Sequence, residues 1–240
     1  MSIEPQNGLI SKLDPKSPVV EAYRTLRTNL QFANVDKPLT RVLITSPGPG
    51  EGKSTIAANL AYVMAQSGQR VIAVSVDLRK PTLHKYFGLP NQPGVTNILA
   101  GQTSIDDCLQ GTDTENLRLL ASGPTPPNPA ELLGSAQMRS LVDELQKRAD
   151  FIIYDAPPVI AVTDAAVLAP LMDGVLLVIN AGTVPRELAI RSKEQLEKVG
   201  AKVLGTVLNR VDVASGYGYY YYYYYYTEEP KGKGSTEAAV

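Results

Sequence analysis

The chain has 240 residues, of which 44% are apolar and 20% are charged, an ordinary globular mixture. This length predicts one large α/β domain with a buried core and leaves little room for a second full domain. The formal net charge of −1 excludes the overall basic field that nucleic acid or acidic lipid would require.

The cysteine content and the hydropathy pattern indicate a cytoplasmic protein. The only cysteine is Cys108, which cannot form an internal disulfide and is expected to be a small core residue in a helix. The first residues lack the basic and apolar regions of a secretory signal. No apolar run approaches the ~20 residues of a membrane span, so we expect membrane association only through a partner.

The N-terminal part predicts a flexible lead-in followed by a helix. Residues 1–17 are polar and rich in Pro and Ser. Residues 18–34 are expected to be helical, with Ser17 as the N-cap and Pro18 in the first position. The apolar stripe of this helix comprises Val20, Tyr23, Leu26 and Leu30.

From Arg41 onwards, strands alternate with helices. The expected strands are Arg41–Thr45, Val71–Val76, Leu117–Ala121, Phe151–Tyr154, Val175–Ile179 and Val203–Leu208. The expected helices are Lys53–Ser67, Gln137–Arg148, Thr163–Leu171 and Pro185–Val199. Continuous apolar runs are typical of strands buried on both faces of a parallel sheet. The pattern predicts a doubly wound, mostly parallel α/β sheet with ligands at the carboxyl ends of its strands.

The globular pattern stops after Val213, and residues 214–240 are expected to be disordered. Tyr217 and Tyr219–Tyr226 give nine tyrosines within ten residues. Such a tract is either a sticky low-complexity segment or a concentrated set of phosphate acceptors.

The segment Ser46–Thr55 predicts a phosphate-binding loop. Gly52, Lys53 and Ser54 supply the second half of the G-x-x-x-x-G-K-[ST] motif, although Pro47 stands where the first glycine is usual. A strand precedes this loop and a helix follows it, as the motif requires. Lys53 is expected to reach the β- and γ-phosphates of ATP, and the Ser54 hydroxyl to bind Mg²⁺. The candidate ATP-binding residues are Gly48, Gly50, Glu51, Gly52, Lys53, Ser54 and Thr55, with Asn209 expected near the adenine.

Two carboxylates that follow strands are candidate Mg²⁺ ligands beside Ser54. Asp155 ends the strand Phe151–Tyr154, in the position of a Walker B residue, although turn capping is the plain alternative. Asp77 follows the strand Val71–Val76 and is a second candidate for the metal or for activating an attacking hydroxyl. Arg79 is expected to pair with a phosphate or with Asp77, a surface ion pair being the alternative. The candidate catalytic residues are thus Lys53, Asp77, Arg79 and Asp155.

Several motifs in this order resemble the bacterial tyrosine kinases of capsular and exopolysaccharide synthesis, in their separate cytoplasmic form. The resemblance covers about Val19 to Val213 and the tyrosine cluster. Its motifs are Glu21–Arg27, Ser46–Thr55, Asp77–Leu83, Pro126–Leu133 and Asp155–Pro158.

The resemblance implies a P-loop kinase that uses ATP and Mg²⁺ as a non-specific protein-tyrosine kinase. It implies that Glu21, Arg24 and Arg27 pack subunits into a ring, although i,i+3 ion pairs on a solvated helix are the plain alternative. It also implies a transmembrane activator of the polysaccharide co-polymerase type and a protein-tyrosine phosphatase as partners. The implied acceptors, phosphorylated by a neighbouring subunit, are Tyr217, Tyr219, Tyr220, Tyr221, Tyr222, Tyr223, Tyr224, Tyr225 and Tyr226.

One position departs from the family pattern. The family's Asp-x-Asp-x-Arg segment reads here as Ser75-Val76-Asp77-Leu78-Arg79, so the first carboxylate is missing. Loss of a general base typically slows a reaction ~10²–10⁴-fold without preventing nucleotide binding. A nucleotide-binding regulatory scaffold with impaired catalysis therefore remains an alternative. A partition-type ATPase switch is disfavoured because Gly48 occupies the position of its signature lysine.

Overall fold

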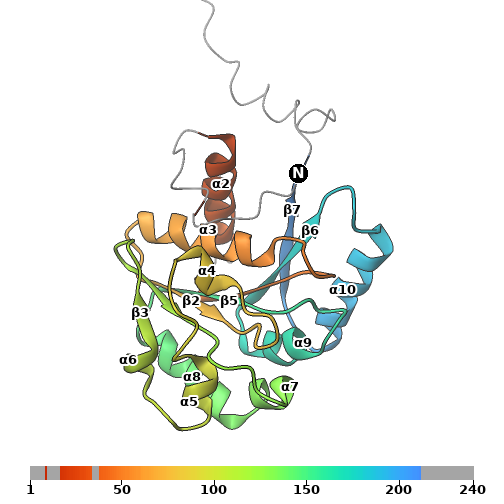
Figure 1. Cartoon of the computed structure of the whole chain (residues 1–240). Helices are drawn as coiled ribbons and strands as arrows, with labels where there is room; N and C mark the ends of the chain where they lie inside the picture. Colours follow the sequence, from red (N-terminus) through yellow and green to blue (C-terminus); the bar gives the residue numbers. More distant parts are fainter. Residues whose placement is uncertain (1–8, 10–16, 34–37, 212–240) are drawn as a thin grey trace, which may run out of the picture. The chain divides into compact units, whose positions relative to one another are not determined.

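The computed structural model describes Leu9, residues 17–33 and residues 38–211 (Figure 1). The predicted lead-in, apart from Leu9 and Ser17, lies outside these residues. The tyrosine tract and the rest of the predicted tail at 214–240 also lie outside them.

A seven-stranded sheet forms the centre of the described fold, in the order β3-β4-β2-β5-β1-β6-β7. Every neighbouring pair is parallel except β3 and β4. The strands are β1 (Arg41–Thr45), β2 (Val71–Ser75), β3 (Leu109–Gly111), β4 (Leu117–Leu120), β5 (Phe151–Asp155), β6 (Gly174–Asn180) and β7 (Val203–Asn209). The predicted mostly parallel α/β class is confirmed.

Helices cover both faces of this sheet (Figure 1). They are α2 (Pro18–Phe32), α3 (Lys53–Gln66), α4 (Leu83–Tyr86), α5 (Val95–Leu99), α6 (Ile105–Cys108), α7 (Pro129–Leu133), α8 (Ala136–Gln146), α9 (Asp164–Leu168) and α10 (Arg186–Lys198), with a 3₁₀ turn, η1, at Ala169–Leu171. Among the described residues, no helix is long and apolar enough to cross a membrane.

Two separate apolar clusters show that the sheet is covered on both sides. Successive residues of β1 belong to different clusters: Leu43 packs with α8 and α9, whereas Val42 and Ile44 pack with α2 and α3. Side chains that alternate in this way project to opposite faces of a strand. Burial on both faces explains why the central strands read as continuous apolar runs.

The structure corrects the sequence prediction mainly at element ends and in short elements. The first helix ends at Phe32 rather than at residue 34, and the predicted helix Thr163–Leu171 divides into α9 and η1. The strand β3 and the helices α4, α5 and α7 were not predicted, because segments of three to five residues carry too little periodicity. Of α6, only the helical position of Cys108 was expected. Cys108 ends α6 and is fully buried, as predicted.

The helix α2 begins and packs as its sequence predicts. The Ser17 hydroxyl accepts a hydrogen bond from the Val20 N–H at 3.3 Å, which makes Ser17 the N-cap. Tyr23 and Leu30 are buried in the same cluster as α3. The apolar stripe therefore covers α3 rather than facing solvent.

Asp173 fixes the start of β1, the strand that leads into the phosphate loop. Its Oδ2 accepts hydrogen bonds from the Thr40 N–H, the Thr40 hydroxyl and the Arg41 N–H at 3.0, 2.8 and 2.9 Å, and its Oδ1 accepts one from Arg41 Nη2 at 2.9 Å. Partial burial raises the pKa of Asp173, but hydrogen bonds from Arg41 and Thr40 outweigh this effect and lower the pKa to about 2. A carboxyl with a lowered folded-state pKa stabilises the fold above its unfolded pKa, and this contribution is lost as pH falls through the folded pKa.

We expect Asp173→Asn to lower the free energy of unfolding at pH 7 by about 1–2 kcal/mol, a value already reduced for solvent screening. Urea unfolding followed from pH 7 to pH 3 should show the difference narrowing below pH ~4, where the unfolded-state carboxyl becomes protonated. Asp150→Asn, in the exposed ion pair with Arg70, is the control and should cost less. A deficit that stayed constant down to pH 3 would contradict this assignment.

Candidate functional site

The strand order brings the predicted site residues to one edge of the sheet. β5 lies between β1 and β2, so the phosphate loop after β1 and the segments after β2 and β5 are neighbours. The backbone oxygen of Asp155 accepts hydrogen bonds from the N–H groups of Val76 and Asp77, each at 2.9 Å. Asp77 and Asp155 are therefore held side by side by the backbone.

The phosphate loop has the conformation that anion binding needs. Gly50 and Gly52 have positive φ angles of 76° and 95°, a region that residues with a Cβ avoid. Gly52 is the N-cap of α3, and no side chain among the described residues caps this helix end. The first N–H groups of α3 are thus available to a phosphate, with the partial positive charge of the helix end behind them.

Asn209, at the end of β7, lies against the phosphate loop. Its Nδ2 donates a hydrogen bond to the backbone oxygen of Glu51 at 2.8 Å. A Cβ on Gly52 would lie 2.1 Å from the same Nδ2. The amide thus braces the loop, and the expected adenine contact stays a prediction.

Glu51 is folded into the loop rather than exposed to solvent. Its carboxylate accepts hydrogen bonds from the N–H groups of Gly48 at 2.5 Å and Asn180 at 3.4 Å. Burial raises the pKa of Glu51 despite these hydrogen bonds. The carboxylate therefore closes the loop on itself, which leaves Glu51 only its backbone for a nucleotide contact.

Lys53 lies between the two predicted carboxylates. Its Nζ is 2.9 Å from Asp77 Oδ2 and 3.4 Å from Asp155 Oδ1. Burial by itself would lower the pKa of Lys53, but the charges of Asp155 and Asp77 outweigh burial and raise it. The lysine is therefore charged at neutral pH and is paired with acids where a phosphate would bind.

The predicted Mg²⁺ ligands fit that ion. Asp155 is fully buried, which raises its pKa, and its Oδ2 has no hydrogen-bond partner among the described residues. The Ser54 hydroxyl lies 3.3 Å from Lys53 Nζ and accepts a hydrogen bond from the Thr82 hydroxyl at 3.0 Å. Hard oxygen donors of this kind are what Mg²⁺ prefers. Ser54, Asp77 and Asp155 are thus suited to hold it.

Thr55 of the loop also contacts the segment after β2. Its hydroxyl lies 2.7 Å from the Tyr86 hydroxyl of α4. Neither this contact nor the one from Thr82 to Ser54 was predicted, because no spacing rule links a loop to a four-residue helix. Together they place α4 and its approach against the phosphate loop.

The expectation that Arg79 pairs with Asp77 is corrected, whereas its expected phosphate contact stays a prediction. Its guanidinium does not pair with the Asp77 carboxylate; instead, Nε and Nη2 donate to Asp164 Oδ2 and Oδ1 at 3.0 and 2.9 Å. Asp164, the first residue of α9, is fully buried. The sequence reasoning missed Asp164, whose only signal was an acidic residue in an otherwise apolar helix.

Ser75 ends β2 in register with Asp155 on β5, at the site itself. Register partners on parallel strands project to the same face. Ser75 is fully buried, and its hydroxyl has no hydrogen-bond partner among the described residues. Ser75 therefore replaces the family's first carboxylate at a buried position beside Asp155, not on the protein surface.

The predicted oligomerisation residues lie on α2, away from this site. Arg24 pairs with Glu21 on the same helix, as the plain alternative predicted. Arg27 Nη1 donates to the backbone oxygen of Val63 on α3 at 3.3 Å. These contacts neither test nor exclude a role between subunits, which stays a prediction.

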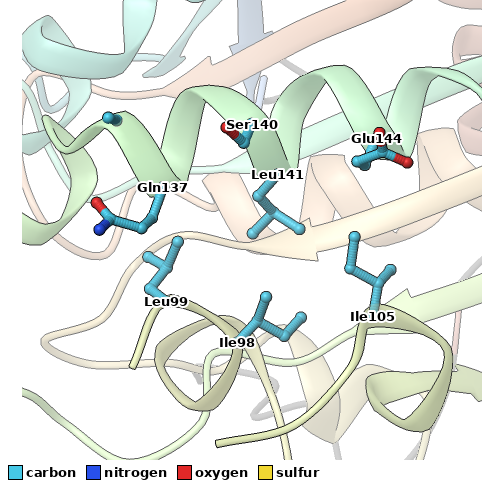
Figure 2. A pocket seen from close by; sticks show the side chains of 8 residues that line it. Ile98, Leu99, Ile105, Gln137, Ser140, Leu141 and Glu144 are labelled. Atoms are coloured by element: carbon cyan, nitrogen blue, oxygen red, sulfur yellow. The ribbon is translucent and has the colours of Figure 1, made fainter. Parts of the chain in front are cut away.

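A cavity of about 420 Å³ lies elsewhere, between α5, α6 and α8. Figure 2 shows Leu141 of α8 pointing towards Ile98, Leu99 and Ile105. None of the candidate site residues lines this cavity. It is a groove between helices and has no role in the phosphate site.

Comparison with known proteins agrees with the geometry. The family described as AAA domain matches residues 41–196. Tyrosine-protein kinase YwqD of Bacillus subtilis (strain 168) is 46% identical over 204 residues, which are 85% of this chain and 86% of YwqD. The chain belongs to the bacterial tyrosine-kinase family.

Solved structures of similar proteins place this member of the family on the P-loop NTPase fold. The chimerical protein CapA2B2 is 43% identical with a TM-score of 0.82, and the match covers 85% of this chain and 89% of that one. The septum site-determining protein MinD of Pyrococcus horikoshii OT3, solved as a complex with Mg-ADP, is 26% identical with a TM-score of 0.62 over 72% of this chain and 71% of that one. The chain thus shares its fold with a nucleotide-bound protein that is not named a kinase.

We expect Gly52→Ala to weaken binding of a fluorescent ATP analogue, because its Cβ would displace the Asn209 amide that contacts the loop and the φ angle of 95° is strained for alanine. Gly68→Ala is the matched control, since Gly68 has a φ angle of 87° and open space around it. The control should carry a similar backbone strain and still bind the analogue. Equal binding by both variants would contradict the close approach at Gly52.

Proposed function

We propose that this chain is an ATP-dependent protein-tyrosine kinase that phosphorylates its C-terminal tyrosines in trans and regulates capsular or exopolysaccharide synthesis or export. The convergence of Lys53, Asp77 and Asp155 on the phosphate loop carries the proposal. The family supports a kinase, since YwqD is named a tyrosine-protein kinase.

The proposed chemistry begins with a change of partners for Lys53, Asp77 and Asp155 when the nucleotide binds. On nucleotide binding, Lys53 would leave its two carboxylates for phosphate oxygens, and Asp77 and Asp155 would be free to hold Mg²⁺ with Ser54. An ion held there would supply positive charge to offset the negative charge of the nucleotide phosphates. Asp77, whose Oδ2 lies 2.9 Å from Lys53 Nζ, is the carboxylate proposed to accept the tyrosine proton as a general base.

The acceptor is proposed to be the tyrosine tract. From Asn209 to Tyr226 the chain has 17 residues, which span up to ~56 Å when extended. That reach is enough to enter a neighbouring subunit's site. A concentrated set of acceptors in a chain that also carries a phosphate-binding loop favours the acceptor role over a merely sticky segment.

The remaining expectations enter as parts of the same proposal. They are a ring-like homo-oligomer joined through Glu21, Arg24 and Arg27, a transmembrane activator of the polysaccharide co-polymerase type, and a protein-tyrosine phosphatase that reverses the modification. With such an activator, the kinase would work in the cytoplasm, recruited to the membrane. No nucleic acid is expected as a partner, given the net charge of −1.

One observation supports a second candidate function. The buried Ser75 leaves two carboxylates, Asp77 and Asp155, where the family pattern has three. A chain that binds Mg-ATP but transfers phosphate slowly would act as a nucleotide-bound regulatory scaffold.

The test of the kinase function is phosphotyrosine mapping of the tail after incubation with ATP and Mg²⁺, with and without a cytosolic activator fragment. We expect tail phosphotyrosine in the wild type and none in Lys53→Met, because this variant removes the phosphate-binding charge. Lys193→Met, which removes an exposed lysine of α10, is the control and should behave as the wild type. Nucleotide binding without any tail phosphotyrosine would favour the scaffold.

Ser75→Asp should raise the phosphorylation rate by at least ~10-fold if the missing carboxylate limits catalysis. The same variant should have a lower Tm without Mg²⁺, because a third buried carboxylate would share one lysine, and Mg-ATP should restore more of its Tm than it adds to the wild type. Ser75→Asn, similar in shape but uncharged, is the control and should gain no rate. An unchanged rate in Ser75→Asp would show that Ser75 is not limiting.

A further inference from the structure

Asp164 is a buried acid with a specific partner. Its two oxygens accept parallel hydrogen bonds from Arg79 Nη2 and Nε at 2.9 and 3.0 Å. Paired bonds of this type fix the guanidinium plane as well as its distance. Since a buried carboxylate without a partner is strongly unfavourable, Asp164 holds Arg79 at the start of α9.

The turn that contains Arg79 also orients Asp77. Asp77 Oδ1 accepts hydrogen bonds from the N–H groups of Arg79 and Lys80 at 3.3 and 3.0 Å. With Oδ1 occupied by the turn, Oδ2 faces Lys53 Nζ at 2.9 Å. A group that fixes the backbone at Arg79 therefore helps to set the orientation of the Asp77 carboxylate towards the site.

The segment that leads to Asp164 is itself anchored on β1. The Val159 N–H donates to the Ser46 oxygen at 2.9 Å, and the Thr45 hydroxyl donates to the Pro157 oxygen at 2.7 Å. The contact between Asp164 and Arg79 thus joins the turn after β2 to a segment already fixed beside the phosphate loop. The turn after β2, whose Asp77 contacts Lys53, is thus linked to the segment after β5.

We propose that Asp164 is a positioning residue that acts through Arg79 to orient Asp77, and that Arg79 serves this contact instead of binding a phosphate. Two guanidinium nitrogens are already engaged on Asp164, and moving Arg79 to a phosphate would leave Asp164 buried without a partner. The proposal rests on the kinase function for its rate effects. Its effect on Mg²⁺ binding is independent of phosphate transfer.

The test compares Asp164→Asn, Arg79→Met and the double variant in the full chain. Binding of a fluorescent ATP analogue is titrated with Mg²⁺, and tail phosphorylation gives kcat and the KM for ATP. Each single variant should weaken apparent Mg²⁺ affinity and lower kcat ~10–100-fold, as loss of a residue that orients a metal ligand does. The KM for ATP should stay within about threefold, because phosphate contacts remain. The double variant should be no worse than either single one.

Several outcomes would overturn the proposal. If Arg79→Met lost far more kcat than Asp164→Asn, or if the two losses multiplied, Arg79 would contact the substrate directly. An unchanged Mg²⁺ titration in both single variants would also sink it. Asp173→Asn controls for general destabilisation and should leave the Mg²⁺ titration unchanged.

A further variant and a wild-type measurement cover the cases in which Asp164→Asn does not fold or the chain does not phosphorylate its tail. If Asp164→Asn fails to fold, Arg79→Lys keeps the positive charge, loses the paired geometry and should show the same shift in Mg²⁺ dependence. A wild-type chain that binds Mg-ATP without phosphorylating its tail would overturn the kinase function alone. The Mg²⁺ titrations would then still support or overturn the role of Asp164.

Discussion

The contact of Lys53 with Asp77 and Asp155 depends on β5 lying between β1 and β2. Each of the three residues comes from a different one of these strands or from the loop that follows it. In this order the acid that ends β5 lies beside the loop after β1, and the acid after β2 lies one strand further along the same edge. The same adjacency joins Asp77 to the backbone of Asp155. The phosphate site is therefore a direct consequence of the crossover connections.

The buried charges of this edge are arranged so that nearly every one has an opposite partner. Lys53 pairs with two carboxylates, and Arg79 pairs with Asp164. Charges buried without partners would destabilise the fold, which explains the close packing of these ion pairs. Two polar atoms at this edge, Asp155 Oδ2 and the Ser75 hydroxyl, have no partner among the described residues. They mark the place where a ligand can add interactions that the protein by itself leaves unmade.

The likeness to MinD shows that this fold also occurs in a septum site-determining protein. A difference in function between two such proteins must come from particular residues rather than from the shared fold. Gly48 in the phosphate loop is one candidate position, because partition-type ATPases are expected to carry their signature lysine there. In this chain the loop is also held by Glu51 from inside and by Asn209 from the end of β7.

The sequence by itself determined the phosphate loop, the parallel α/β class, the N-cap at Ser17 and the positions of Asp77 and Asp155 at strand ends. These features are local, since they depend on spacing within one loop, one strand or one helix turn. Only the tertiary structure decided that Arg79 pairs with Asp164, 85 residues further along the chain, and that Asn209 contacts Glu51. It also decided that Ser75 is buried in register with Asp155. Partners of this kind are set by strand order and crossovers, which leave no periodic signal in the sequence.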